Sequence, residues 1–334
     1  MNPSHRAIVS RRRVLTVIAG AALAAGGLPA GAAWRGAYEW RGVALGADAR
    51  LVLVDEDQAA AQRALRLCLA EIERLESLFS LYRPYSELCR LNRDSVLRYP
   101  SLDMVAVLRI ARRVGQASGG AFDVSVQPLW RLYADHFRRH PNDRTGPPAR
   151  EIEKTLECVD FSRIRVSDAE IRIAPGMALT LNGIAQGYIT DRVAALLRGH
   201  GWRDVLIDLG EMRAAGTTPA GSPWTAVVRP PIRSSTAPLQ VTLSGRAMAT
   251  SAGRATAFEP SGRHHHLFSP RDGRSAGQFH SVSVVAAQAI VADALSTALH
   301  VMPRREMPKL INAFPAAEAW LVGADGSIAH LKRA

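Results

Sequence analysis

Apolar and polar positions alternate along the chain in two periods that predict its helices and strands. Residues 43–54, VALGADARLVLV, alternate as a strand does, and residues 57–77 repeat apolar side chains with the helical period. The apolar positions of this predicted helix are Leu65, Cys68, Leu69, Ile72 and Leu75. Residues 79–92, FSLYRPYSELCRLN, contain a proline and predict a loop. Residues 101–117 predict a second helix, with Ser101 as its N-cap.

The second half of the chain is richer in strands. The charged, proline-containing residues 138–150 predict a surface excursion. Helices are expected at about 184–199, 292–302 and 304–314. Strands are expected at 162–168, 170–175, 204–210, 224–230, 239–245, 281–287, 319–324 and 327–331. Strands mixed with segregated helices predict an α+β fold, with a mixed or antiparallel sheet and packed helices. No linker divides residues 34–334, so one domain is expected there.

Composition and charge narrow the class of protein. The chain has 334 residues, of which 47% are hydrophobic and 22% charged, as in ordinary globular proteins. Its net charge of +12 could favour nucleic acid, an anionic membrane surface or an anionic ligand. Four of the arginines fall within residues 1–32, and the others are scattered without interleaved aromatic side chains. We therefore expect no binding of nucleic acid.

Residues 1–33 have the layout of an export signal. A basic start precedes a modest apolar run from Val14 to Leu28, and small residues end in an A-x-A site at Ala32. The Arg11-Arg12 pair resembles the twin-arginine signal. Glycines and a proline break the apolar run, so we expect cleavage with no stable membrane span, although a retained anchor is the alternative. No cysteine follows the site, which predicts a soluble periplasmic protein and not a lipoprotein.

The three cysteines, Cys68, Cys89 and Cys158, have no CxxC spacing. An exported chain could form one disulfide and leave one cysteine over. The position of Cys68 on an apolar helix face favours a core residue instead.

The usual nucleotide signatures are missing from the sequence. No GxGxxG follows a strand, and neither a Walker-type loop nor a GxSxG elbow is present. A nucleotide would have to be bound in another way.

The apolar stretch IVADALSTAL, residues 290–299, carries oxygen side chains in its middle. Asp293 and Thr297 are four residues apart and share a helix face with Ser296 nearby. Oxygen ligands of this kind suit Mg²⁺. The alternative is that Asp293 is the N-cap of a helix that begins with ALSTAL, and these residues alone favour the cap.

Three further stretches each allow a structural and a functional interpretation. SGGAFDVSVQPLW (118–130) places Asp123 after two glycines, where the backbone could approach a ligand or form an Asx turn. TLNGIAQGYITDR (180–192) places Gly183 and Gly187 at a helix start, where they could expose backbone groups to an ion, or Asn182 could be a plain N-cap. RHHHLFSPRDG (263–273) has three consecutive histidines, which face alternate ways and so do not predict a single-ion site; one could be a general base.

The order of these stretches resembles the ApbE family, the FAD-protein FMN transferases. The resemblance runs through FSLYRPYSELCRLN, GGAFDVSVQPL, LNGIAQGY, ATSAG, HHLFSPRDG and ADALSTAL, from about residue 40 to 330. It implies an α+β enzyme that uses Mg²⁺ and takes FAD as its substrate. Such an enzyme transfers FMN to a Thr or Ser hydroxyl of an acceptor flavoprotein and releases AMP. The acceptor motif would be D-x-x-[ST]-[GS]-A-[ST].

The resemblance also implies roles for particular residues. His266 would be the catalytic base, because it matches the histidine before the family's I-[IL]-D-P segment. The metal would be held by Gly183, Asp293, Ser296 and Thr297. FAD would contact Leu45, Tyr82, Ala121, Phe122, Asp123, Thr180, Gln186 and Leu267. With these roles, the resemblance favours the metal over the cap for Asp293.

The chain departs from the family pattern at four places. Thr180 and Gln186 replace an acid and a base of the usual D-L-G-G-I-A-K-G, Ser269 replaces an aspartate, and Glu211 stands at the usual second glycine of L-G-G. Two alternatives therefore accompany the transferase: an exported FAD-binding accessory protein, and a pyrophosphatase that hydrolyses FAD. Some exported relatives serve respiratory flavoproteins, including a NosX-like branch, and the sequence leaves the acceptor open.

Overall fold

The computed structural model describes residues 36–44, 46–55, 57–231 and 234–333. The predicted export signal at residues 1–33 and the predicted FAD contact Leu45 lie outside the described residues.

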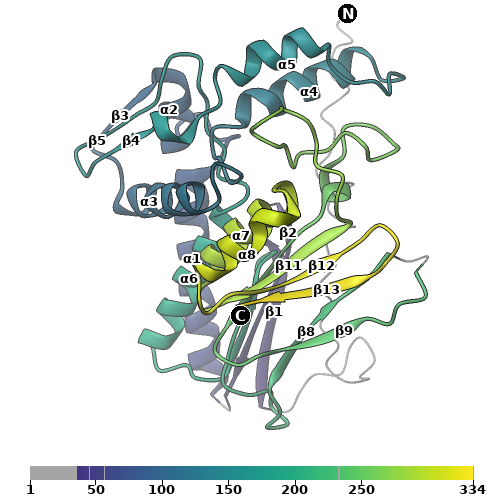
Figure 1. Ribbon diagram of the computed structural model, residues 1–334. Coiled ribbons are helices and arrows are strands. Elements are labelled where there is room, and N and C mark those ends of the chain that lie inside the picture. Colours follow the sequence, from purple (N-terminus) through teal and green to yellow (C-terminus); the bar gives the residue numbers. More distant parts are fainter. Residues whose placement is uncertain (1–35, 45, 56, 232–233, 334) are drawn as a thin grey trace, which may run out of the picture.

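A large antiparallel sheet forms the centre of the molecule (Figure 1). Within the described residues it has eight strands in the order β1-β2-β6-β7-β10-β11-β12-β13, and every neighbouring pair is antiparallel. The strands are β1 (Ala37–Ala44), β2 (Ala47–Val54), β6 (Val205–Asp208), β7 (Met212–Ala215), β10 (Ala247–Ser251), β11 (Ser281–Ala286), β12 (Glu318–Val322) and β13 (Ile328–Lys332).

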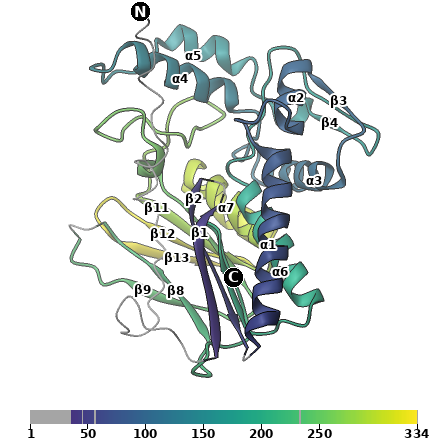
Figure 2. The same cartoon turned by 180° about the vertical axis from the view of Figure 1, so that it is seen from behind.

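Alternating side chains give this sheet two covered faces. On β2, Leu51 and Leu53 belong to the core on the helical side, whereas Val52 belongs to a second core on the other side. Helices α1 (Gln58–Phe79), α6 (Ala185–Gly199) and α7 (Ala289–Val301) pack on the first face (Figure 2). The ribbon of β8 (Trp224–Val228) and β9 (Leu239–Leu243) packs on the second, where Trp224 is buried.

Helices α2 to α5 and strands β3 to β5 form a cap at one end of the sheet and its helices (Figure 1). A small sheet of β3 (Val96–Arg98), β5 (Glu170–Arg172) and β4 (Arg165–Val166) lies beside α2 (Glu87–Asp94) and α3 (Leu102–Ala117). Helices α4 (Gln127–Arg139) and α5 (Ala149–Leu156) share an apolar cluster with Phe268. Helix α8 (Met307–Asn312) follows α7 in the chain.

The α+β prediction is confirmed, as are the helices expected at 57–77, 101–117 and 184–199. The predicted cap Ser101 is confirmed, because its side chain accepts a hydrogen bond from the backbone N–H of Met104, and Asp57 caps α1 in the same way through Ala60. Cys68 is buried in the core, and the three cysteines, all within the described residues, are free. No helix among the described residues is both long and apolar enough to cross a bilayer.

Three local predictions were wrong. The strand expected over 43–54 is a hairpin, because Gly46 takes a φ of +77° and turns the chain between β1 and β2. The loop expected over 79–92 contains α2, whose N-cap Ser86 compensates for the preceding proline. Strands β7 and β10 were missed because they are short and rich in alanine, so their place in the sheet comes from packing between longer neighbours.

Candidate functional site

Helix α7 carries the predicted metal ligands on a buried face. Asp293 is the fifth residue of this helix and is 3% exposed, and Ser296 is 1% exposed. The N-cap of α7 is Gln288, so the interpretation of Asp293 as a cap was wrong. The helix begins earlier than the sequence suggested because its first turn is capped from another element.

That cap comes from Asp191 on α6. Its carboxylate accepts hydrogen bonds from the backbone N–H groups of Ala289 (2.9 Å) and Ile290 (3.0 Å). The guanidinium of Arg213 pairs with the same carboxylate at 2.7 Å and donates to the carbonyl of Ala287 at 2.8 Å. A carboxylate at a helix N-terminus satisfies free N–H groups and complements the helix dipole. Asp191 therefore fixes the start of α7 against α6 and β7.

Two glycines allow α6 and α7 to approach closely. The N–H of Gly187 donates to Oδ2 of Asp293 at 3.0 Å, and a Cβ at Gly187 would lie 2.4 Å from the carbonyl oxygen of Ala289. A Cβ at Gly183 would lie 2.9 Å from Oγ1 of Thr297 and 3.6 Å from the ring of Phe122. The structure thus brings four sequence-predicted residues together: Gly183, Phe122, Asp293 and Thr297.

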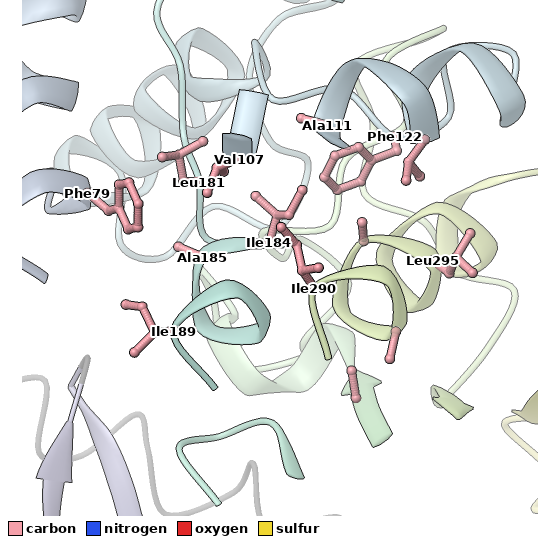
Figure 3. Close-up of a cluster of buried hydrophobic side chains, with 14 of the residues drawn as sticks. Phe79, Val107, Ala111, Phe122, Leu181, Ile184, Ala185, Ile189, Ile290 and Leu295 are labelled. Atoms are coloured by element: carbon pink, nitrogen blue, oxygen red, sulfur yellow. The ribbon is translucent and has the colours of Figure 1, made fainter. Parts of the chain in front are cut away.

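The packing around these residues is apolar. Figure 3 shows Phe122, Ile184, Ile290 and Leu295 within one cluster of buried side chains. An apolar surrounding lowers the local dielectric and strengthens any charge interaction inside the site.

A strand end supplies a further hydroxyl that the sequence analysis did not single out. The Oγ of Ser251, the last residue of β10, lies 2.7 Å from Oγ of Ser296 and 3.2 Å from Oγ1 of Thr297. Ser296 also donates to the carbonyl of Asp293 at 2.9 Å. The stretch ATSAG contains Ser251, and its hydroxyls were the available signal in the sequence.

Burial makes this site electrostatically demanding. Desolvation raises the pKa of Asp293 to about 7, although the N–H of Gly187 opposes the shift. Desolvation and the charge of Asp293 also raise the pKa of Glu211 well above its usual range. Buried carboxylates beside neutral hydroxyls and main-chain groups form a set of hard oxygen donors, which fits a divalent cation such as Mg²⁺.

A cavity of about 320 Å³ opens beside the predicted FAD contacts. Ala121 lines it together with residues 269–272, 274–278 and 301–303. This volume lies at the lower end of the range for small-molecule pockets, about 300–1,000 Å³. It could take one ring system of a dinucleotide.

Asp123 forms the Asx turn that the sequence analysis gave as its structural alternative. Its carboxylate accepts from the N–H (2.7 Å) and the Oγ (2.6 Å) of Ser125 and from the N–H of Phe161 (2.9 Å). These donors occupy the carboxylate inside the protein. Asp123 therefore shapes the backbone of residues 121–123, through which a ligand could be contacted.

The histidine run places its three rings differently. Nδ1 of His266 lies 3.2 Å from the carbonyl oxygen of Thr256, and a carbonyl can only accept, so Nδ1 carries the proton and Nε2 keeps its lone pair. Burial, reinforced by His265, lowers the pKa of His266 to about 4. His265 is itself buried and bonds the carbonyl of Ala276 at 2.7 Å, while His264 bonds the carbonyl of Arg144 at 3.1 Å.

The other predicted contacts are spread more widely. Tyr82 lies on the loop between α1 and α2 and is 60% exposed. Oγ1 of Thr180 accepts from the N–H of Asn182 at 3.3 Å, and Asn182 is not the N-cap of α6, which is Ile184. Nε2 of Gln186 donates to the carbonyl of Leu209 at 3.2 Å. Leu267, next to His266, is buried.

Comparison with known proteins shows the family. A profile described as "ApbE family" matches residues 45–321, which is most of the chain and includes every site residue described above. The chain belongs to the ApbE family.

Curated relatives in the ApbE family carry one name. A protein of Klebsiella pneumoniae (strain 342) named FAD:protein FMN transferase is 28% identical over 271 residues, 78% of this chain and 81% of that protein. A protein of Treponema pallidum with the same name is 27% identical over 292 residues, covering 80% of this chain and 79% of that protein.

Solved structures agree on the fold. The apbe protein of Thermotoga maritima superposes with a TM-score of 0.76 at 26% identity, covering 88% of this chain and 97% of that one. The flavin transferase ApbE of Vibrio cholerae gives a TM-score of 0.77 at 21% identity, covering 89% and 97%.

Proposed function

We propose that this chain is an enzyme that transfers FMN from FAD to a hydroxyl group of another protein. The observation that carries the proposal is the buried oxygen site, where Asp293 on α7 meets Gly187 on α6 and Thr297 meets Gly183 before α6. A buried carboxylate beside hydroxyls is costly in a core unless it binds something. The reaction we propose is the one named for the relatives, the transfer of FMN from FAD to a protein.

Mg²⁺ is the cation we propose for this site. Gly183, Asp293, Ser296 and Thr297 would hold it, because Mg²⁺ takes oxygen ligands and commonly shares its shell with substrate phosphates. When bound, it would neutralise negative charge at the pyrophosphate under attack.

FAD would lie between this site and the cavity beside Ala121. The ring of Phe122 lies near Gly183 at the proposed metal site, and the neighbouring Ala121 lines the cavity. The segment 121–123 therefore connects the metal site to the cavity. Thr180 and Gln186 are neutral and would contact FAD through hydrogen bonds only. Tyr82, Leu45 and Leu267 complete the proposed FAD contacts.

His266 would serve as the general base. Its Nε2 would accept the proton of the acceptor hydroxyl while the hydroxyl oxygen bonds to the phosphorus of the FMN half. The bond between the two phosphates breaks, and AMP leaves with the electron pair. The contact of Nδ1 with the carbonyl of Thr256 fixes the tautomer in which the lone pair of Nε2 is free to accept this proton.

The partner would be an exported flavoprotein that carries a D-x-x-[ST]-[GS]-A-[ST]-like motif. The Arg11-Arg12 pair supports twin-arginine export to the periplasm, a route that carries folded proteins. Replacing both arginines with lysine should leave an uncleaved, FAD-binding precursor in the cytoplasm. Normal export and cleavage of that variant would contradict this route.

Chromatography of the flavin products distinguishes the transferase from its two alternatives. The protein is incubated with FAD and Mg²⁺, with and without an acceptor domain. We expect AMP to appear only with the acceptor and no free FMN to accumulate. Free FMN without acceptor would indicate a pyrophosphatase, and unchanged FAD in both samples would indicate a binding protein, an outcome to which the neutral Thr180 and Gln186 give weight.

A further inference from the structure

Glu211 is a buried carboxylate with an unused oxygen. It follows Gly210 in the turn between β6 and β7, and it is 7% exposed. The backbone N–H of Thr250 faces the carboxylate and opposes the rise of its pKa. Its Oε2 has no hydrogen-bond partner in the part of the chain that the structure describes. Leaving a buried charged oxygen unpaired costs free energy, so its occurrence calls for a physical explanation.

Helix α6 connects Glu211 to the proposed metal site. Oγ1 of Thr190 lies 3.4 Å from the carbonyl oxygen of Glu211, and Gln186 lies against Gly210, where a Cβ would be 2.5 Å from its Nε2. The next residue, Gly187, donates to Asp293. One turn of α6 therefore touches the Glu211 turn and the Asp293 carboxylate.

Strand β10 makes the same connection from the other side. The backbone of Thr250 faces the carboxylate of Glu211, and the hydroxyl of the adjacent Ser251 lies within hydrogen-bond distance of Ser296 and Thr297. Thr250, which faces Glu211, is therefore the direct neighbour in the chain of Ser251, which contacts the proposed metal ligands. Helix α6 and strand β10 thus each connect Glu211 to the proposed metal site.

The charges around Glu211 are negative. Asp293 is the strongest charge that acts on it, followed by Asp208, and both raise its pKa. Among the described residues, no Lys or Arg acts appreciably on either Glu211 or Asp293. Asp208 differs, because Arg50 offsets its charge. Two buried carboxyl groups of like charge, with no basic side chain to balance them, are stabilised by a shared proton or by a cation.

We infer that Glu211 is a second carboxylate of the cation site, with its free Oε2 holding the cation directly or through one water. This inference rests on the proposed binding of Mg²⁺. Asp293 and Glu211 together carry the two negative charges that a divalent cation neutralises. The neighbouring Gln186 is an uncharged amide, so the charge of Glu211 remains available to the cation.

Direct binding of Mn²⁺, followed by electron paramagnetic resonance with and without FAD and without acceptor, tests this inference. Glu211→Gln keeps the shape of the side chain and removes its charge, so the affinity for Mn²⁺ should fall about 10–100-fold, the range seen when residues supporting a metal are changed. Asp208→Asn removes a nearby charge that Arg50 partly offsets, and it should change the affinity much less than Glu211→Gln does.

Thermal unfolding provides a second readout that needs no bound substrate. Without metal, Glu211→Gln should melt at or above the wild-type temperature because an uncompensated charge is gone, and its Mn²⁺-induced stabilisation should be smaller. Wild-type affinity in Glu211→Gln, with loss in Asp293→Asn, would overturn the role of Glu211 and leave the metal site standing. A wild-type protein that binds no Mn²⁺ in either condition would overturn the metal site itself.

Discussion

The backbone N–H of Gly187 donates to the carboxylate of Asp293 at 3.0 Å, and this bond joins α6 to α7 inside the core. The contact is possible only because Gly187 has no side chain, since a Cβ there would meet the backbone of Ala289. The position of the proposed metal ligand is therefore set by how closely two helices pack. Substitutions that change this packing should affect the site without touching its ligands.

Gly187→Ala should separate the two helices. A Cβ only 2.4 Å from a backbone oxygen forces a backbone shift, and overpacking of this kind costs about 1–3 kcal/mol. Urea unfolding should report that loss, and Mn²⁺ binding should weaken with it. Gly199→Ala is the matched control on the same helix, where a Cβ meets nothing within 4 Å. Equal stability of the two variants would show that the α6–α7 contact does not constrain the site.

Asp191→Ala should release the start of α7. The change removes the helix cap and leaves Arg213 without its partner, so we expect a loss of about 2–4 kcal/mol. Amide exchange at Ala289 and Ile290 should accelerate beyond what global unfolding explains. Asp191→Asn keeps one acceptor oxygen and should fall between the wild type and Asp191→Ala. Unchanged protection in Asp191→Ala would contradict the cap.

His266→Ala should retain FAD binding and lose turnover by about 10²–10⁴-fold, the usual contribution of a general base. His264→Ala is the control, because His264 is only half-buried and bonds a distant carbonyl. His265 is unsuitable as a control, since its buried ring packs against Gly253 and its loss should destabilise the segment. Equal losses of turnover in the His264 and His266 variants would point to a structural role for the whole run.

His300 should make stability depend on pH. Burial, with His265, His266 and His280 nearby, lowers its pKa to about 3, and neither ring nitrogen has a partner among the described residues. At pH values below the ordinary pKa of about 6.5, this histidine binds a proton in the unfolded chain but not in the folded protein. This site's contribution to unfolding free energy should therefore fall as pH drops from about 7 to about 5, approaching 1.4 kcal/mol per pH unit.

His300→Phe removes that proton from the unfolded state. Urea unfolding at several pH values should then show a shallower fall in stability towards acid than in the wild type. The slope is the readout, because a fixed packing cost of phenylalanine is the same at every pH. Identical slopes in the two proteins would mean that His300 is protonated equally in both states.

Much of the fold follows from periodicity in the sequence, and the site follows less directly. Long amphipathic segments such as residues 57–77 form helices that their own apolar period predicts. The spacing of Asp293 and Thr297 likewise predicts that they share one face of α7. The start of α7 could not be predicted from the local sequence, because the helix is capped by Asp191, which lies 98 residues before Ala289 in the chain. Ser251 was likewise not predicted as a site residue, since only the sheet brings it to α7.

The most direct test of the proposed function is the intact mass of an acceptor domain after incubation with this protein, FAD and Mg²⁺. We expect the acceptor to gain the mass of one FMN minus water, with yellow in-gel fluorescence that survives denaturation. An acceptor whose target threonine is replaced by valine should gain nothing, and Asp293→Ala or chelation of the metal should abolish the gain. An unmodified acceptor with the wild-type protein, or full modification by Asp293→Ala, would contradict the account.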